Sequence, residues 1–136
     1  MPRNTLDHTA DTGLEASADS LARLIEELAV GMFELMASVD VCPDDHRVEA
    51  LTEATSAEDL VVDTLSELLY LSETEGLHFC RVEVELTGDT AVKLEAWGVP
   101  IEDVELTGPP IKAVTYHLLE VSATDTGWRA TVYFDV

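Results

Sequence analysis

The stretch SAEDLVVDTLSELLYLSETEGLHFCRVEVELTGDTAVKLEAW, residues 56–97, decides the fold class of this 136-residue chain. Its first part predicts an amphipathic helix, because Ser56 with Asp59 three positions later forms a capping-box-like start and Gly76 suits the C′ position. The apolar spacing predicts a buried stripe of Leu60, Val61, Leu65, Leu68, Leu69 and Ser72. Residues 77–86 and 91–97 alternate as strands on either side of a turn, which predicts an antiparallel hairpin.

The segments outside this stretch extend the same pattern toward both ends of the chain. Another amphipathic helix begins at Asp19 or Ser20, which are alternative N-caps, and ends before residues 39–45. Further strands are predicted at 14–18, 47–54, 112–123 and 128–134, with a loop over 98–110. We therefore expect one α+β domain over residues 1–136, in which two amphipathic helices pack on a largely antiparallel β-sheet.

The charge of the chain excludes several classes of partner. Asp and Glu total 28 against 7 Lys and Arg, a formal net charge of -21. A surface this negative repels phosphates, so neither direct RNA binding nor docking on anionic membranes is expected. No apolar run approaches the roughly 20 residues of a transmembrane helix, and the start lacks an apolar signal core. We expect a cytoplasmic protein, and self-repulsion favours a monomer.

The acidic residues have two interpretations. They could form a partner-specific acidic face, or a solvated shell spread over the whole surface and adapted to a salt-rich interior. Carboxylates occur in every segment without a block of five or six together, which favours the diffuse, salt-adapted surface. Salt screens the repulsion between them, so the thermal unfolding midpoint is expected to rise from low to molar KCl.

The two cysteines, Cys42 and Cys80, lack CxxC spacing. This pattern favours two reduced, partly buried thiols over a disulfide or a zinc site.

Two clusters at the ends of the chain could carry chemistry. Asp7 to Asp11 (DHTAD) precedes a glycine turn, and the chain ends at Asp135 and Val136 directly after a predicted strand. If the amino-terminal loop meets that strand end, Asp11, Asp135 and the terminal carboxylate converge. Three carboxylates repel one another and favour a hard divalent cation; calcium takes 6–8 oxygen ligands, whereas magnesium keeps more water.

Structural interpretations of both clusters stay open. An Asp-His loop often serves as a turn or helix cap, and a terminal strand can end because the sheet is complete. His78 and His117 fall within predicted strands and are expected to have structural roles. No nucleophile elbow, phosphate-binding glycine loop or Cys/His pair is present, so no catalytic and no cofactor-binding residue is assigned.

Four stretches together resemble the archease family, small acidic proteins that assist the RtcB-type RNA ligase. They are DHTAD with Gly13, the helix from Asp19 to Met36, KAVTYH at residues 112–117, and the terminal VYFDV at residues 132–136. The four run in order along the whole chain, which makes the combination far more specific than one short motif.

The resemblance implies a non-catalytic accessory factor that promotes guanylylation and multiple turnover of the ligase in tRNA splicing and RNA repair. It also implies a divalent-metal site, with calcium as the expected ion. Its ligands would be Asp11, Asp135 and Val136, the last through its backbone or terminal carboxylate, with Asp7 and His8 in support. Lys112 and Tyr116 belong to the family signature without an assigned role.

The expected contact is with a basic surface of the ligase rather than with RNA. Either the metal-bearing tip docks near the ligase site, or binding shifts the ligase toward a guanylylation-ready conformation. Two other classes compete with this interpretation. One is a small metal-dependent hydrolase with His8 as acid/base; the other is a general chaperone or structural calcium-binding module.

Overall fold

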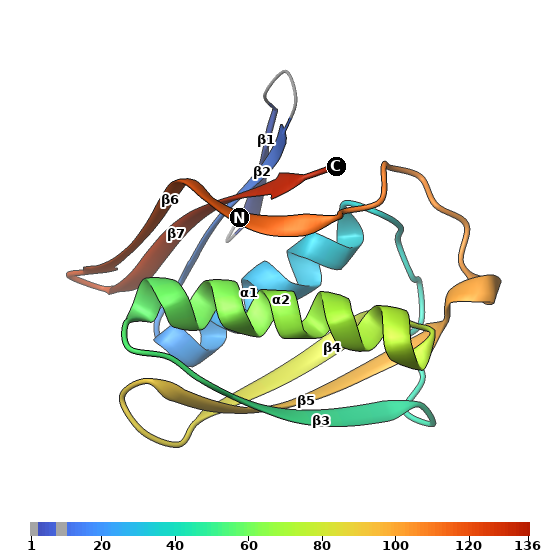
Figure 1. Cartoon of the computed structure of the whole chain (residues 1–136), viewed down its shortest axis with the longest axis horizontal. Helices are drawn as coiled ribbons and strands as arrows, with labels where there is room; N and C mark the ends of the chain where they lie inside the picture. The colour runs from blue at the N-terminus through green and yellow to red at the C-terminus, as the bar shows by residue number, and fades with distance from the viewer. Residues whose placement is uncertain (1–2, 8–10) are drawn as a thin grey trace.

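Two helices lie between two antiparallel sheets in the computed structural model of the chain, which describes residues 3–7 and 11–136 (Figure 1). The helices are α1 (Leu21–Glu34) and α2 (Ala57–Glu75). The strands of the described residues are β1 (Arg3–Asp7), β2 (Asp11–Ala18), β3 (Arg47–Glu53), β4 (Leu77–Leu86), β5 (Ala91–Pro100), β6 (Ala113–Thr124) and β7 (Gly127–Asp135). The predicted α+β class is therefore confirmed, although the strands divide between two sheets instead of forming one.

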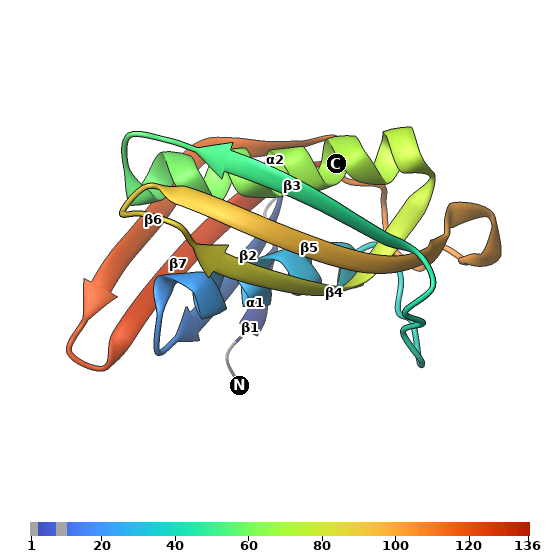
Figure 2. The same ribbon diagram turned by 90° about the horizontal axis from the view of Figure 1, so that it is seen from below.

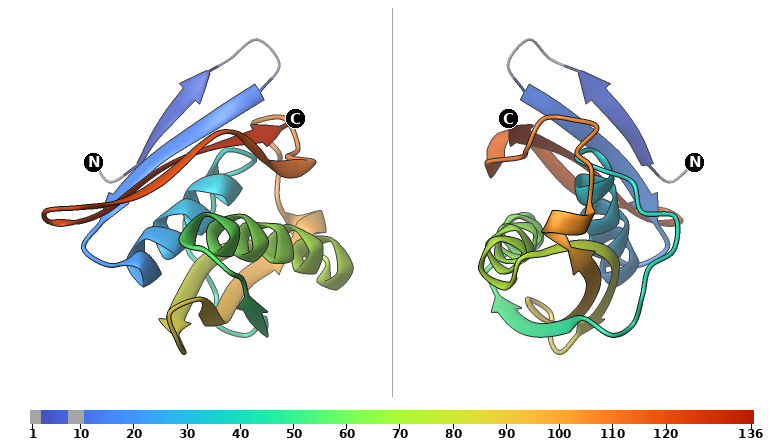
Figure 3. Two further views of the ribbon diagram at one scale, coloured as in Figure 1. Left: turned by 60° about the vertical axis from the view of Figure 1, so that its left-hand side comes forward. Right: turned by 90° about the vertical axis from the view of Figure 1, so that its right-hand side faces the viewer.

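The sheets differ in strand order. The first, sheet A, has the order β1-β2-β7-β6, and the second, sheet B, has the order β3-β5-β4. The helices fill the space between them, with sheet A on one side and sheet B on the other (Figure 3). Because each helix packs against both sheets, one continuous apolar core joins the two sheets.

Both helices begin at serine caps that the sequence suggested. The Ser20 hydroxyl accepts from the Arg23 N–H at 3.2 Å, and the Ser56 hydroxyl accepts from the Asp59 N–H at 3.1 Å. Helix α2 ends at Gly76, whose φ of 68° is left-handed. Four members of its predicted stripe are completely buried, namely Leu60, Val61, Leu65 and Leu68, whereas Leu69 is only partly buried.

Some predicted strand and loop boundaries needed correction. Strand β1 was not predicted; its backbone pairs with β2 in antiparallel register. Strand β5 continues three residues into the predicted loop, because Gly98 to Pro100 keep pairing with the start of β4. A short 3₁₀ helix, η1 (Ile101–Asp103), follows β5 within the same predicted loop.

The expectation of free thiols was wrong: Cys42 and Cys80 form a disulfide, with their Cα atoms 5.8 Å apart. Cys80 sits at the register shift of β4 between Phe79 and Arg81, beside the segment that follows α1. The cysteines are 38 residues apart in sequence, so only the fold brings them together. Neither described helix is long and apolar enough to cross a membrane.

Candidate functional site

Strand β7 brings the carboxyl end of the chain to the middle of sheet A. Asp135, its last residue, is paired with Asp11 of β2 on one side and with Ala113 of β6 on the other. The Lys112 backbone N–H adds a hydrogen bond of 2.8 Å to the Asp135 carbonyl oxygen. The polypeptide backbone at Asp135 is therefore held from both sides.

The alternation of β7 explains why the Asp135 side chain faces water. Ala130, Val132 and Phe134 point into the core and are at most 1% exposed, whereas Asp135 is exposed. The side chain of Val136 is partly buried and packs against the core. This packing anchors Val136 next to the exposed Asp135.

The predicted metal ligands can be located on this frame. The register sets Asp11 directly across from Asp135, and Asp7 opposite Thr12, one residue further along β2. His8 lies outside the described residues, as do the side chains of Asp7 and Asp11. Among the described side chains, no three His, Cys, Asp or Glu groups converge. Asp11 and Asp135 are register partners, and coordination of a metal by their oxygens stays a prediction.

The KAVTYH stretch lines the other edge of this region. Pairing between β6 and β7 is interrupted between Thr115 and Glu120, and Leu118 within the interruption has a φ of 53°. A non-glycine residue in this left-handed region marks an irregular backbone. The sequence predicted one continuous strand here, and the interruption could not be found from its alternation pattern.

Tyr116 in this interruption connects sheet A to α2. Its hydroxyl donates a hydrogen bond of 2.9 Å to Asp59 Oδ1, although the side chain is 57% exposed. This hydrogen bond to a carboxylate, with smaller contributions from burial and from Asp63, raises the pKa of Tyr116 above its ordinary value. Tyr116 thereby acquires a structural role that the sequence left unassigned.

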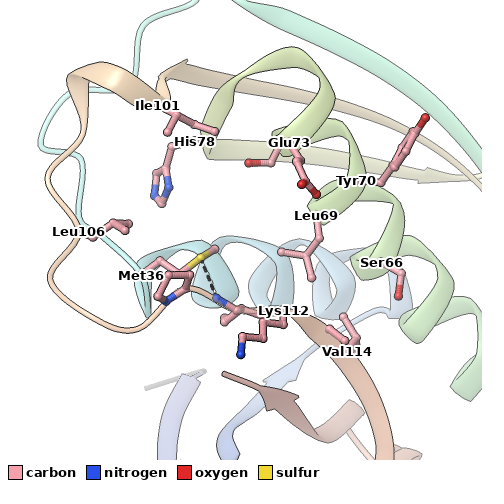
Figure 4. A pocket seen from close by; sticks show the side chains of 14 residues that line it. Met36, Ser66, Leu69, Tyr70, Glu73, His78, Ile101, Leu106, Lys112 and Val114 are labelled. Carbon is pink, nitrogen blue, oxygen red and sulfur yellow. Dashed lines mark hydrogen bonds between the residues drawn. The ribbon is translucent and has the colours of Figure 1, made fainter.

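A cavity of about 670 Å³ opens beside the start of β6 (Figure 4), and no sequence pattern predicted it. The second half of α2, residues 101–111 and the first residues of β6 form its walls. Most of the lining is apolar, including Leu69, Ile111 and Val114. Leu69 and Ser72, the two members of the predicted stripe that are only partly buried, both line this cavity.

Two basic side chains line the same cavity. Lys112 is exposed, and it is engaged in no ion pair within the described part of the chain. His78 is 5% exposed and its Nε2 lies 3.2 Å from the Ala37 carbonyl oxygen, to which a protonated Nε2 donates. Burial lowers the pKa of His78 below the usual histidine value, although the bond to Ala37 opposes this shift. His78 thus has the structural role predicted for it.

Comparison with known sequences identifies one family along the chain. The sequence model of the Archease protein family (MTH1598/TM1083) matches residues 4–136. A relative called Protein archease from Methanosarcina barkeri is 34% identical, over 96% of this chain and 93% of the relative. Another Protein archease, from Methanopyrus kandleri, is 31% identical over the full length of both chains.

Solved structures agree with the sequence comparison. The solution structure of protein 1598 from Methanobacterium thermoautotrophicum matches with a TM-score of 0.82 and 26% identity, over 99% of both chains. The crystal structure of a Thermotoga maritima archease, described as a possible chaperone, matches with a TM-score of 0.68 and 26% identity. That match covers 98% of this chain and 97% of the other. These findings confirm the resemblance that the sequence motifs indicated.

Proposed function

The chain belongs to the archease family, and from this membership we propose that it is a non-catalytic accessory factor of an RtcB-type RNA ligase. In this role it promotes guanylylation and multiple turnover of the ligase during tRNA splicing and RNA repair. The family match over residues 4–136 supports the proposal, because it includes every motif stretch from DHTAD to the last residue.

The functional centre of the proposal is a divalent-cation site where the two ends of the chain meet. Directly opposed residues of an antiparallel pair lie on the same face of a sheet, and Asp11 and Asp135 are such a pair. The terminal carboxylate of Val136 follows immediately, and Asp7 and His8 are supporting candidates. The strand register at this site is the observation that carries the proposal.

The donor set fits a hard cation. Carboxylate oxygens are the ligands that calcium prefers, and calcium accepts them in loose geometry. When bound, the cation would neutralise the carboxylates that we propose as its ligands. The protein contributes the placement, since β6 and β2 hold Asp135 from both sides and the core holds Val136.

The charge of the chain supports a protein partner over RNA. With a net charge of -21, the chain repels nucleic acid and attracts the basic surface that a ligase presents around its RNA channel. Both routes to activation fit this contact. The end of the molecule that carries Asp11, Asp135 and Val136, here called the tip, can act at the ligase site itself, or binding can favour the guanylylation-ready conformation.

The test is ligation by the purified cognate ligase under single- and multiple-turnover conditions, with and without this protein. We expect stimulation by the wild type, and its loss in Asp11→Ala and Asp135→Ala with the fold intact. Asp125→Ala is the matched control, since Asp125 is exposed at the β6–β7 turn, the other end of the strand that carries Asp135. Wild-type stimulation in both tip variants would reject the metal-centred mechanism.

A general chaperone is the second candidate. The description of the Thermotoga maritima relative as a possible chaperone favours it. It predicts that this chain suppresses aggregation of several unrelated proteins. An effect confined to the ligase favours the accessory role instead.

A further inference from the structure

The rim of the cavity beside α2 carries apolar side chains that are exposed to solvent. Tyr70, Ile101 and Leu106 all line it, and they are 61%, 45% and 53% exposed. Figure 4 shows Tyr70 on α2 and Ile101 with Leu106 on the opposing segment. Exposed apolar side chains gathered around one cavity of an acidic protein indicate a surface that a partner covers. We call the cavity and this rim the α2 groove.

The loop wall of the α2 groove is fixed in place. The N–H groups of Thr107 and Gly108 donate to the Met36 carbonyl oxygen at 2.9 and 3.2 Å, and the Ile101 N–H donates to Gly76 at 2.9 Å. A Cβ at Gly108 would overlap the Leu35 carbonyl oxygen, so the glycine permits this close approach. A wall held by these contacts is preformed for binding, which reduces the entropy cost of association.

Charges around the groove indicate the chemistry of its occupant. Glu73 lines the α2 side, and Glu102 and Glu105 are exposed next to the two rim residues of the loop. This acidic surround fits an apolar segment with basic residues on either side. Lys112, on the β6 side, supplies a donor for a backbone carbonyl of that segment (Figure 4).

Other occupants fit less well. A second copy of this chain would bring another net charge of -21 against the same carboxylates, and RNA would be repelled in the same way. A small molecule within about 670 Å³ would fill the cavity and leave the exposed rim uncovered. A polypeptide segment can fill the cavity and cover the rim together.

We propose that the α2 groove binds an apolar segment flanked by lysine or arginine on the partner protein. The inference rests on the proposed function in taking the RtcB-type ligase as that protein. It adds a second contact, separate in its residues from the carboxylate tip. The tip would act on the ligase, and the groove would hold the two proteins together.

The first experiment measures affinity between the purified ligase and the full-length chain. The double variant Ile101→Ser/Leu106→Ser is expected to bind at least about tenfold more weakly, as for central apolar contacts of an interface. The control is Val41→Ser/Leu51→Ser, which changes residues 81% and 76% exposed that do not line the groove. Thermal unfolding of each variant confirms that the fold is kept.

The second experiment identifies the occupant directly. The photo-crosslinking residue p-benzoylphenylalanine replaces Leu106 in one sample and Leu51 in another, and each is irradiated with the purified ligase. We expect a crosslink from position 106 to an apolar ligase segment with flanking Lys or Arg, also when Asp135→Ala is present. A crosslink from position 51 alone, or one from 106 to an acidic segment, would overturn the inference.

The outcomes separate the two proposals. If the wild type stimulates the ligase and the groove variant binds as tightly as the control, the groove inference fails and the proposed function stands. If the wild type neither binds nor stimulates the ligase, the proposed function fails, and the groove inference that rests on it fails too.

Discussion

Sheets A and B are both antiparallel, yet their polar groups are arranged differently. In sheet B, Arg47 contacts both Glu49 and Glu95, and the Arg81 guanidinium lies 3.8 Å from the centre of the Trp97 ring. Figure 2 shows the whole of this sheet from its outer side. In sheet A, Asp135 makes no ion pair with any described residue.

The difference indicates which half of the molecule meets a partner. Arg47 and Arg81 of sheet B are engaged with neighbouring side chains of the same sheet, and the disulfide ties β4 to the segment after α1. At the Asp135 end of sheet A, the Asp135 and Lys112 side chains form no ion pair with the described part of the chain. This difference agrees with the proposed function, which places the contact with a partner at the Asp135 end of sheet A.

Reduction of the disulfide should produce the largest loss of stability. The Cys42–Cys80 bond closes a loop with a sequence separation of 38, and native disulfides typically contribute about 2–4 kcal/mol. Urea unfolding with and without reductant measures the loss. The Cys42→Ser/Cys80→Ser variant should be less stable and insensitive to reductant. Equal stability of the reduced and oxidised wild type would contradict the claim that the disulfide stabilises the packing of sheet B.

The turn glycines of the two sheets should respond differently to alanine. Gly127, at the β6–β7 turn, has a φ of 153°, and an added Cβ would overlap the Ala18 carbonyl oxygen. We expect Gly127→Ala to cost about 1–3 kcal/mol. At the β4–β5 turn, an added Cβ on Gly88 meets nothing within 4 Å, so Gly88→Ala should change stability by less than about 0.5 kcal/mol. Urea midpoints compare the two, and equal effects would contradict this packing difference.

Substitution of one surface arginine in each sheet tests whether ion pairs stabilise sheet B more than sheet A. Arg47 forms ion pairs with two glutamates, whereas Arg129 of sheet A pairs, among the described residues, with Glu120 at 3.5 Å. Arg47→Gln should lower the thermal midpoint in dilute buffer more than Arg129→Gln does. Because salt screens exposed pairs, the gap should close in molar KCl while the wild-type midpoint rises. A gap that persists at high salt, or a flat wild-type response, would argue against this electrostatic account.

The smallest expected effect is on the pH dependence of stability, and it concerns the buried histidine His78. Burial lowers the pKa of His78, so the unfolded chain binds this proton at higher pH than the folded chain does. The stability that neutral His78 contributes is complete above about pH 6.5 and is lost as the pH falls toward the folded-state pKa. Compared with wild type, His78→Gln should weaken this acid sensitivity. Urea midpoints above and below that pH provide the measurement, and identical pH profiles for wild type and His78→Gln would contradict it.

Local patterns predicted the helices well. The spacing of apolar residues and the helix caps are properties of neighbouring residues, so Ser56 and Gly76 could be assigned from the sequence, and Ser20 was one of two candidate N-caps. The meeting of Asp11 and Asp135 was predicted from the chemistry of the two ends, and the register of β2 and β7 agrees.

Features that depend on distant parts of the chain could not be predicted in this way. The disulfide depends on where β4 lies relative to the segment after α1. The division into two sheets depends on strand pairing, as does the interruption between Thr115 and Glu120. The α2 groove combines residues from a helix, a loop and a strand, and its apolar members resembled ordinary core or loop positions in the sequence.

Calcium titration followed by calorimetry tests the central claim most directly, because it asks whether the two ends of the chain jointly hold an ion. We predict one bound ion in the wild type and in Asp125→Ala. Binding should be lost in Asp11→Ala and in Asp135→Ala, and weakened when one residue is added after Val136. Calcium binding that is absent from the wild type, or unchanged in both aspartate variants, would contradict the account.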